Sequence, residues 1–119
     1  MTTNTFARND LRLEVTDEPD GVRVSWLGRS TARDPASFLG PILLEALQKG
    51  TAGVVLDFRK LEYMNSSTIT PVIRMLHEAK KGGKRVKILF DAKSRWQELS
   101  FSALMIFQTD DKRISIEGV

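Results

Sequence analysis

The sequence predicts an α/β fold in which an antiparallel hairpin precedes helices and strands that alternate around a mixed sheet of four to five strands. Two observations predict it. Residues 11–16 and 22–26 alternate apolar and polar side chains on either side of a turn, which is the period of a strand with one buried face. From residue 34 onward, segments with helical spacing of apolar residues alternate with short apolar runs. This alternation is typical of a layered sheet with parallel pairs, so the expected order is ββαβαβαβ.

The predicted hairpin is closed by the segment Glu18-Pro19-Asp20-Gly21, because proline and glycine suit a tight turn. The apolar positions of its two strands are Leu11, Leu13, Val15, Val22, Val24 and Trp26. We expect residues 1–9 to be a loose N-terminal segment.

A first helix is predicted to begin at Asp34-Pro35, an acidic N-cap followed by proline at the first helical position, and to end at Lys49-Gly50. Its apolar face consists of Leu39, Ile42, Leu43, Ala46 and Leu47. Gly40-Pro41 lies inside this helix, and an internal proline removes a backbone hydrogen bond and clashes with the preceding turn. We therefore expect a kink, or a short turn followed by a helix from Pro41.

Residues 54–58 are apolar without alternation apart from Asp57, which favours a central strand covered on both faces. A loop and a second helix follow. The apolar face of this helix consists of Ile69, Val72, Ile73 and Leu76, and Lys80-Lys81-Gly82-Gly83 ends it. Either Asn65 or Ser66 caps it, or Thr70 does so with Pro71 as first residue. We favour the earlier start because the apolar stripe begins before Thr70.

The C-terminal part is predicted to add a strand over 85–90, a third helix and a final strand marked by Ile114 and Ile116. The third helix opens with the capping-box pattern Ser94-Arg95-Trp96-Gln97. Its expected apolar face is Trp96, Leu99, Ala103, Leu104 and Phe107, and a second face would hold Phe101, Met105 and Ile106. Burial under the chain termini and contact with a partner or second copy are both open for this second face.

The length predicts one domain over residues 1–119. The excess of basic over acidic residues is small. The chain has 18 basic and 15 acidic residues and a net charge of +3. The densest basic group is Lys80, Lys81, Lys84, Arg85 and Lys87. A solvated helix end and strand face account for it, and a nucleic-acid interface is the alternative.

The sequence lacks cysteine, which fits a reducing compartment. The first residues are polar and show no secretory signal, and no apolar run approaches the roughly 18 residues that a membrane span needs. We expect a cytoplasmic protein.

The residues that enzymes use are sparse, so we expect a protein that is not an enzyme, with no catalytic residue, cofactor or metal. His77 is the single histidine, and acid–base catalysis needs a partner within reach. Asp57 ends the predicted central strand, a place where α/β proteins often bind ligands, but bracing of the loop suits it equally. A small hydrolase around Asp57 and His77 is the alternative.

A cluster of hydroxyl residues precedes the second helix. Its members are Ser66, Ser67, Thr68 and Thr70. One of them is expected as an N-cap, but four hydroxyls in five positions exceed what one cap requires. A helix start presents unpaired N–H groups and a partial positive charge, which favour an anion or a phosphorylated hydroxyl.

Three segments resemble the STAS domain, the fold of bacterial anti-sigma factor antagonists. They are Val54-Val55-Leu56-Asp57-Phe58, Met64-Asn65-Ser66-Ser67 and Gly82-Gly83-Lys84-Arg85-Val86-Lys87-Ile88. In the family, an apolar strand ending in Asp is followed by apolar-Asp-Ser-Ser/Thr-Gly-Leu-Gly at the start of a helix, which ends in Gly-Gly before a strand. The resemblance covers most of the chain, from the hairpin to the last strand, and implies a STAS-like fold.

The resemblance implies a bacterial phosphoprotein that acts in signal transduction and transcription regulation by protein binding. Ser66 matches the serine that a partner kinase phosphorylates, with Ser67 and Thr68 as alternatives. The implied partners are an ATP-binding anti-sigma factor with serine kinase activity and a cognate serine phosphatase, and a homodimer is left open. The residues expected at the partner contact are Asp57, Tyr63, Met64, Asn65, Ser66, Ser67 and Thr68.

The chain departs from the family pattern at two places. Asn65 replaces the usual Asp, and Thr68-Ile69-Thr70-Pro71 replaces Gly-Leu-Gly, which restricts the loop backbone. An Asn before a phosphorylated hydroxyl also resembles a STAS-like group of biofilm-regulating phosphoproteins. The alternative function is therefore a STAS-like scaffold or ligand-sensing module that is not phosphorylated.

Overall fold

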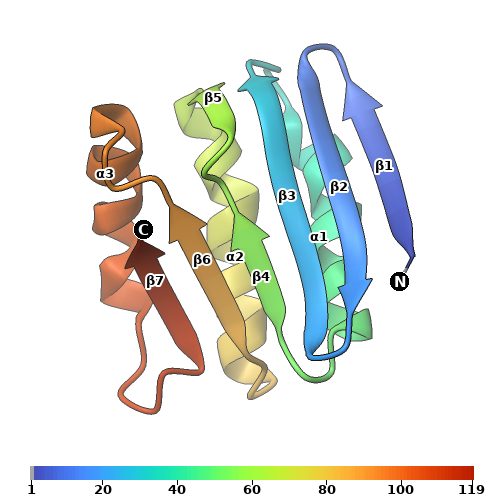
Figure 1. Cartoon of the computed structure of the whole chain (residues 1–119), viewed down its shortest axis with the longest axis vertical. Coiled ribbons are helices and arrows are strands. Elements are labelled where there is room, and N and C mark those ends of the chain that lie inside the picture. The colour runs from blue at the N-terminus through green and yellow to red at the C-terminus, as the bar shows by residue number, and fades with distance from the viewer. Residues whose placement is uncertain (1) are drawn as a thin grey trace.

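A computed structural model describes residues 2–119 and shows one mixed β-sheet covered on a single face by three α-helices (Figure 1). The sheet has seven strands in the order β1-β2-β3-β4-β6-β7, with β5 paired to β3. Its strands are β1 Thr3–Arg8, β2 Leu11–Glu18, β3 Gly21–Ser30, β4 Val54–Asp57, β5 Leu61–Met64, β6 Val86–Phe90 and β7 Ile114–Gly118. Its helices are α1 Pro35–Lys49, α2 Ile69–Lys81 and α3 Arg95–Ser102, with 3₁₀ turns η1 Ser66–Thr68 and η2 Ala103–Phe107.

The predicted α/β fold is confirmed. β2 and β3 form the expected antiparallel hairpin, and β4, β6 and β7 extend the sheet by parallel pairing. The strand number was underestimated because β1 and β5 carry no apolar alternation. Residues 3–8, which we expected to be loose, form β1 antiparallel to β2, and residues 61–64 form β5 parallel to the end of β3.

The core lies between the sheet and the helices. Trp26 of β3, Phe58 after β4 and Phe101 of α3 are fully buried, with ring centroids 4.5 Å apart between Trp26 and Phe58 and again between Phe58 and Phe101. Such tilted aromatic pairs add stability beyond the area that they bury. This stack joins α3 to the centre of the sheet.

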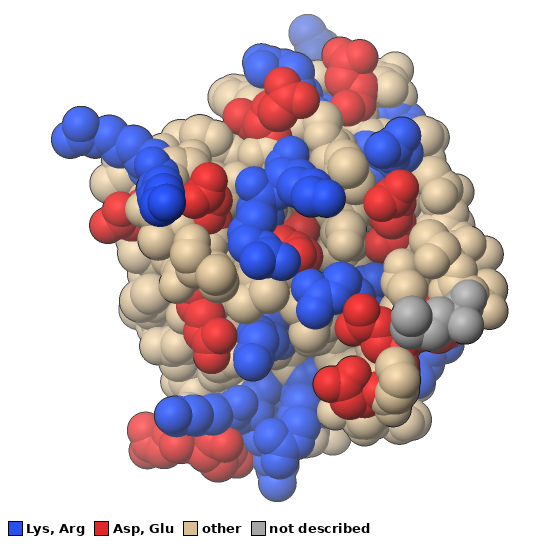
Figure 2. Space-filling view, in the orientation of Figure 1, with Lys and Arg blue, Asp and Glu red and all other residues tan. Residues whose placement is uncertain are grey.

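The other face of the sheet is open and carries interleaved basic and acidic side chains (Figure 2). Its ion pairs are Arg12–Glu14, Arg23–Glu18, Arg23–Asp57, Arg59–Asp57 and Lys87–Glu117. The expectation that residues 54–58 are covered on both faces was wrong, because Val55 lies on this partly exposed side while Val54 and Leu56 face the helices. The basic group at 80–87 is divided between the end of α2 and this face.

Two helices differ from their predictions. α1 runs from Pro35 to Lys49 and contains Pro41 on its exposed side, so there is no separate short turn before a helix that starts at Pro41. The predicted apolar face of α3 was wrong at Leu99, which is 70% exposed, and it left out Phe101, which is buried. Its members Leu104, Trp96 and Phe107 do pack against the core. The buried face consists of Gln97, Phe101 and Leu104, at ordinary helical spacing. Its first member is polar, so a stripe chosen from apolar residues alone was rotated away from it. None of the helices within residues 2–119 is long and apolar enough to cross a membrane.

Gln97 of α3 holds the loop between β4 and β5 in place. Its side chain is 1% exposed; its Oε1 accepts a hydrogen bond from the Asp91 amide at 2.8 Å, and its Nε2 donates to the carbonyls of Phe58 and Leu61 at 2.8 and 2.9 Å. One side chain therefore satisfies three buried backbone groups.

We predict that Gln97→Met lowers the free energy of unfolding by about 2 to 4 kcal/mol, because it keeps the volume but removes three buried or half-buried hydrogen bonds to the backbone. Urea unfolding followed by circular dichroism measures it. The control is Gln48→Met on the exposed side of α1, for which a change within about 0.5 kcal/mol is expected. Equal effects of the two variants would contradict the role of Gln97.

Candidate functional site

The predicted site residues 63–68 lie together where β5 ends and the second helix begins. β5 runs parallel to β3, with Tyr63 opposite Arg29 and Met64 opposite Ser30. The chain then passes through Asn65 into η1, which continues directly into α2. Of the two caps predicted for the earlier start, Asn65 and Ser66, Asn65 is the one observed: it caps η1, and the α-helical part follows from Ile69.

Asn65 organises this loop through its side chain and its backbone. Its Oδ1 accepts hydrogen bonds from the Thr68 amide at 3.1 Å and the Thr68 hydroxyl at 2.7 Å, and its Nδ2 donates to the Ala32 carbonyl at 2.9 Å. Its own amide donates to the Ser30 carbonyl at 2.9 Å. Asparagine serves here as an N-cap and as a donor, a combination that an ionised aspartate cannot provide.

Thr68 belongs to the structural part of the loop. It is fully buried, and its hydroxyl lies 2.7 Å from the hydroxyl of Ser30, which is 2% exposed. Asn65, Thr68 and Ser30 form a closed polar network between the sheet and the helix start. The Thr68 hydroxyl is therefore inaccessible to a modifying enzyme in the folded chain.

Ser66 and Ser67 are exposed. Within residues 2–119, their hydroxyls make no side-chain hydrogen bond, in contrast to Thr68. They occupy the first two positions of η1, where backbone N–H groups have no partner within the helix and the helix dipole favours negative charge. The fold holds both hydroxyls outward on a rigid support.

Tyr63 and Met64, which precede the two serines in the chain, differ in their surroundings. Tyr63 is 41% exposed, and the guanidinium of Arg29 lies 4.9 Å from the centre of its ring, a cation–π contact. Met64 is half-buried and packs against the core. Tyr63 therefore contributes a surface contact, whereas Met64 mainly anchors the end of β5.

Asp57 stands apart from this loop, on the open face of the sheet. Its carboxylate receives hydrogen bonds from the Arg59 guanidinium at 2.7 and 2.9 Å, from the Arg59 amide at 3.1 Å and from Arg23 at 3.1 Å. Burial acts to raise its pKa, but the hydrogen bonds from Arg59 and the charges of Arg59 and Arg23 outweigh burial and hold the pKa of Asp57 below its usual value. Asp57 braces the segment that leaves β4.

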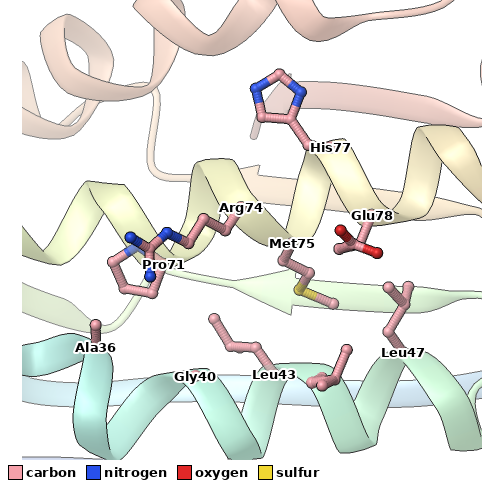
Figure 3. Close-up of a pocket in the computed structure, with 10 residues that line it drawn as sticks. Ala36, Gly40, Leu43, Leu47, Pro71, Arg74, Met75, His77 and Glu78 are labelled. Carbon is pink, nitrogen blue, oxygen red and sulfur yellow. The ribbon is translucent and has the colours of Figure 1, made fainter.

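An apolar groove of about 440 Å³ runs between α1 and α2 (Figure 3). Leu43, Leu47 and Met75 line it, and Leu44 at its edge is 47% exposed. A Cβ added at Gly40 would meet nothing within 4 Å, so this glycine leaves the groove open along α1. Sequence reasoning missed this surface, although Gly40-Pro41 on the helix was its signal.

His77 has no catalytic setting in the described chain. Its ring packs edge-on against Phe107 with centroids 5.3 Å apart. Residues 2–119 contain no group of three or more His, Cys, Asp or Glu side chains placed to hold a metal ion.

We predict that Asn65→Ala lowers the free energy of unfolding by about 1 to 3 kcal/mol, because it removes the side-chain cap on the Thr68 amide and hydroxyl and the donor to the Ala32 carbonyl. Thermal or urea unfolding measures it. The neighbouring Ser66→Ala is the matched control and should change stability by no more than about 0.5 kcal/mol. A loss at Ser66 as large as that at Asn65 would show that the network is assigned wrongly.

The lowered pKa of Asp57 leads us to expect that the protein loses stability in acid. Because its pKa is lower in the folded chain than the roughly 3.9 of an unfolded one, its ionised form stabilises the fold above that pH, and this contribution disappears as pH falls through the lower folded value. We expect Asp57→Asn to be less stable than wild type at pH 7 and to lose less stability between about pH 5 and about pH 3. Urea unfolding at several pH values measures both slopes.

The control for this pH series is Asp20→Asn in the exposed hairpin turn, which should keep the wild-type slope. Parallel slopes for wild type and Asp57→Asn would refute the effect.

No family model and no curated protein matches the chain. Several solved structures match its fold. SiaC of Pseudomonas aeruginosa superposes with a TM-score of 0.65 at 19% identity, over 100% of this chain and 98% of SiaC. A chain of the crystal structure of the diguanylate cyclase SiaD in complex with its activator SiaC, also from Pseudomonas aeruginosa, gives 0.61 at 21% identity, over 98% and 99%.

A third match is an uncharacterised protein from Shewanella loihica described as having a SpoIIAA-like fold. Its TM-score is 0.55 at 14% identity, over 94% of this chain and 90% of that one. At these identities the likeness concerns the fold alone. The resemblance to a STAS domain is thereby confirmed at the level of architecture: this chain has a SpoIIAA-like fold.

Proposed function

We propose that this protein is a regulatory protein-interaction module whose partner contact lies on residues 63–67 and is switched by phosphorylation of Ser66. The observation that carries the proposal is the division of three adjacent hydroxyls: Thr68 is buried in a network, while Ser66 and Ser67 are exposed at a helix start. Ser66 is the preferred acceptor because it occupies the first helical position after the Asn65 cap.

A phosphate on Ser66 would change the surface without unfolding the loop. It adds about −1.5 to −2 charges at neutral pH. The adjacent N–H groups and helix dipole favour this charge. Ser66 takes no part in the hydrogen bonds among Asn65, Thr68 and Ser30, so that network is kept. A partner surface shaped for a neutral hydroxyl would have to bury the new charge, which is strongly unfavourable.

Two lines support an enzyme as the partner. The sequence resemblance implies an ATP-binding anti-sigma factor with serine kinase activity, opposed by a serine phosphatase. The structural likeness includes SiaC, described as the activator of the diguanylate cyclase SiaD. Both cases describe a small protein that acts by binding an enzyme. The proposal places this module in the cytoplasm, where a kinase that uses ATP has its substrate.

A binding role fits the titratable residues better than catalysis. Asp57 is held by Arg23 and Arg59, and His77 packs against Phe107, so neither is poised for proton transfer. The alternative is a scaffold or ligand-sensing module of the same fold that is never phosphorylated. Lys87 pairs with Glu117, which weakens the case for a nucleic-acid surface.

We predict that Ser66→Asp weakens partner binding at least about tenfold, a change of roughly 1.4 kcal/mol, and that Ser66→Ala binds like wild type. Binding is measured by quantitative co-purification from the protein's own cells and then with the purified partner. Thr51→Asp, which adds the same charge in an exposed turn, should leave binding unchanged. Identification of the captured enzyme distinguishes the anti-sigma kinase from a cyclase.

Mass spectrometry of the wild-type protein completes this test. Trypsin releases residues 61–74 as one peptide that contains all the candidate hydroxyls, and we expect condition-dependent phosphate on Ser66. A bare peptide under every growth and stress condition, together with unchanged binding of Ser66→Asp, would reject the switch and favour the non-phosphorylated module.

A further inference from the structure

The two edges of the sheet differ in whether other parts of the chain bond to their backbone groups. β1 forms one edge and β7 the other. The edge of β7 is capped by the preceding segment: the Ile114 amide donates to the Thr109 hydroxyl at 3.2 Å, the Ile116 amide donates to the Gln108 side chain at 3.0 Å, and the Thr109 amide donates to the Ile114 carbonyl at 3.1 Å. Among residues 2–119, no segment caps β1 in this way, and all six of its residues are exposed.

The hydrogen-bond pattern of β1 shows which of its backbone groups are free. Thr3 lies opposite Thr16, and the Asp17 amide donates to the Thr2 carbonyl at 2.9 Å. Because the groups of successive residues in a strand point to alternate sides, Asn4, Phe6 and Arg8 bond to β2. The amides and carbonyls of Thr3, Thr5 and Ala7 therefore point away from the sheet, into solvent.

The side chains of β1 do not protect this edge. Natural edge strands are usually blunted by lysine, proline, a bulge or shortness. β1 has six residues and a continuous register with β2. Its sequence Thr-Asn-Thr-Phe-Ala-Arg carries a single charge, on Arg8 at its end. Phe6 remains 36% exposed beside α1.

We propose that β1 pairs antiparallel with β1 of a second copy of this chain, which joins two sheets into one. With the two-fold axis at Thr5, that residue lies opposite its counterpart, and Thr3 lies opposite Ala7 of the second copy. All the free amides and carbonyls of these three residues are then paired. No charged residues face each other, because Arg8 lies beyond this central register.

The side chains support the same register. On the helix-covered face, Phe6 stands opposite Asn4 of the second copy and diagonal to its Phe6. Diagonal neighbours in an antiparallel pair are within reach of aromatic side chains, so the two exposed rings cover each other. On the open face, Thr5 lies opposite Thr5 of the second copy, and Thr3 lies opposite Ala7. Threonine is a good strand former, and alanine is small.

The capped edge of β7 explains why such pairing would stop at two copies. Pairing of β1 with β7 of another copy would be heterologous and would build open fibres, but Gln108 and Thr109 occupy that edge. Pairing of β1 with itself is isologous and closes. One strand pair buries less surface than a standard interface, so we expect a weak dimer that forms at high protein concentration.

Sedimentation velocity on the full chain, without an N-terminal tag, tests the proposal up to about 1 mM, the weak end of specific affinities. We expect a monomer–dimer equilibrium that Thr5→Pro and Thr5→Lys weaken at least tenfold. Proline removes an amide that points away from β2 in the described residues, and lysine places two like charges at the axis. Thr5→Val keeps the amide and should dimerise as well as wild type.

Two further measurements separate edge pairing from other association. Thr16→Lys adds the same charge one strand inward, and should dimerise like wild type. Amide hydrogen exchange at Thr3, Thr5 and Ala7 should slow as protein concentration rises. Each of three results would overturn the proposal. The wild type could stay monomeric up to about 1 mM, or the folded variants Thr5→Pro and Thr5→Lys could dimerise as well as wild type. The exchange rate of these amides could also be independent of protein concentration.

Discussion

The structure depends on burial of one face of the sheet beneath three helices, and the stacked rings of Trp26, Phe58 and Phe101 lie at the centre of that contact. Because the helices share one side (Figure 1), the opposite side must be compatible with water. Its basic and acidic side chains meet in pairs such as Arg23–Asp57 and Lys87–Glu117. The one-sided packing therefore accounts for both the apolar core and the near-balanced charge of the open face.

The same packing positions the loop that follows β5. Gln97 of α3 binds the backbone that leads into this strand, and Asn65 ties its far end to Ser30 and Ala32. β5 is thus held at its start by Gln97 and at its end by Asn65, which also begins the loop that follows. Residues that hold the loop are buried or half-buried, whereas Tyr63, Ser66 and Ser67 are displayed. This separation allows a surface modification to act on a partner without melting the fold.

The β1 edge and the residue 63–67 surface lie on different parts of the molecule. β1 borders the sheet beyond β2, while β5 pairs with the end of β3 (Figure 1). Pairing through β1 would leave both loops of a dimer exposed. Partner binding and self-association would then depend on separate residues, so each can be tested by variants that leave the other intact.

The hairpin, the three helices and the parallel strands could be predicted from the sequence, and so could a helix start near Asn65 or Ser66, because each has a local signal of period, turn or cap. It did not reveal β1 or β5, since both are held by backbone pairing rather than by buried alternate side chains. It also misplaced Leu99 and Phe101, because the buried face of α3 begins with the polar residue Gln97, which a search for apolar residues passes over. Three adjacent hydroxyls are equivalent in sequence, and only the tertiary structure distinguished them. Ser30, distant along the chain, meets Thr68 in the core and leaves Ser66 and Ser67 in solvent.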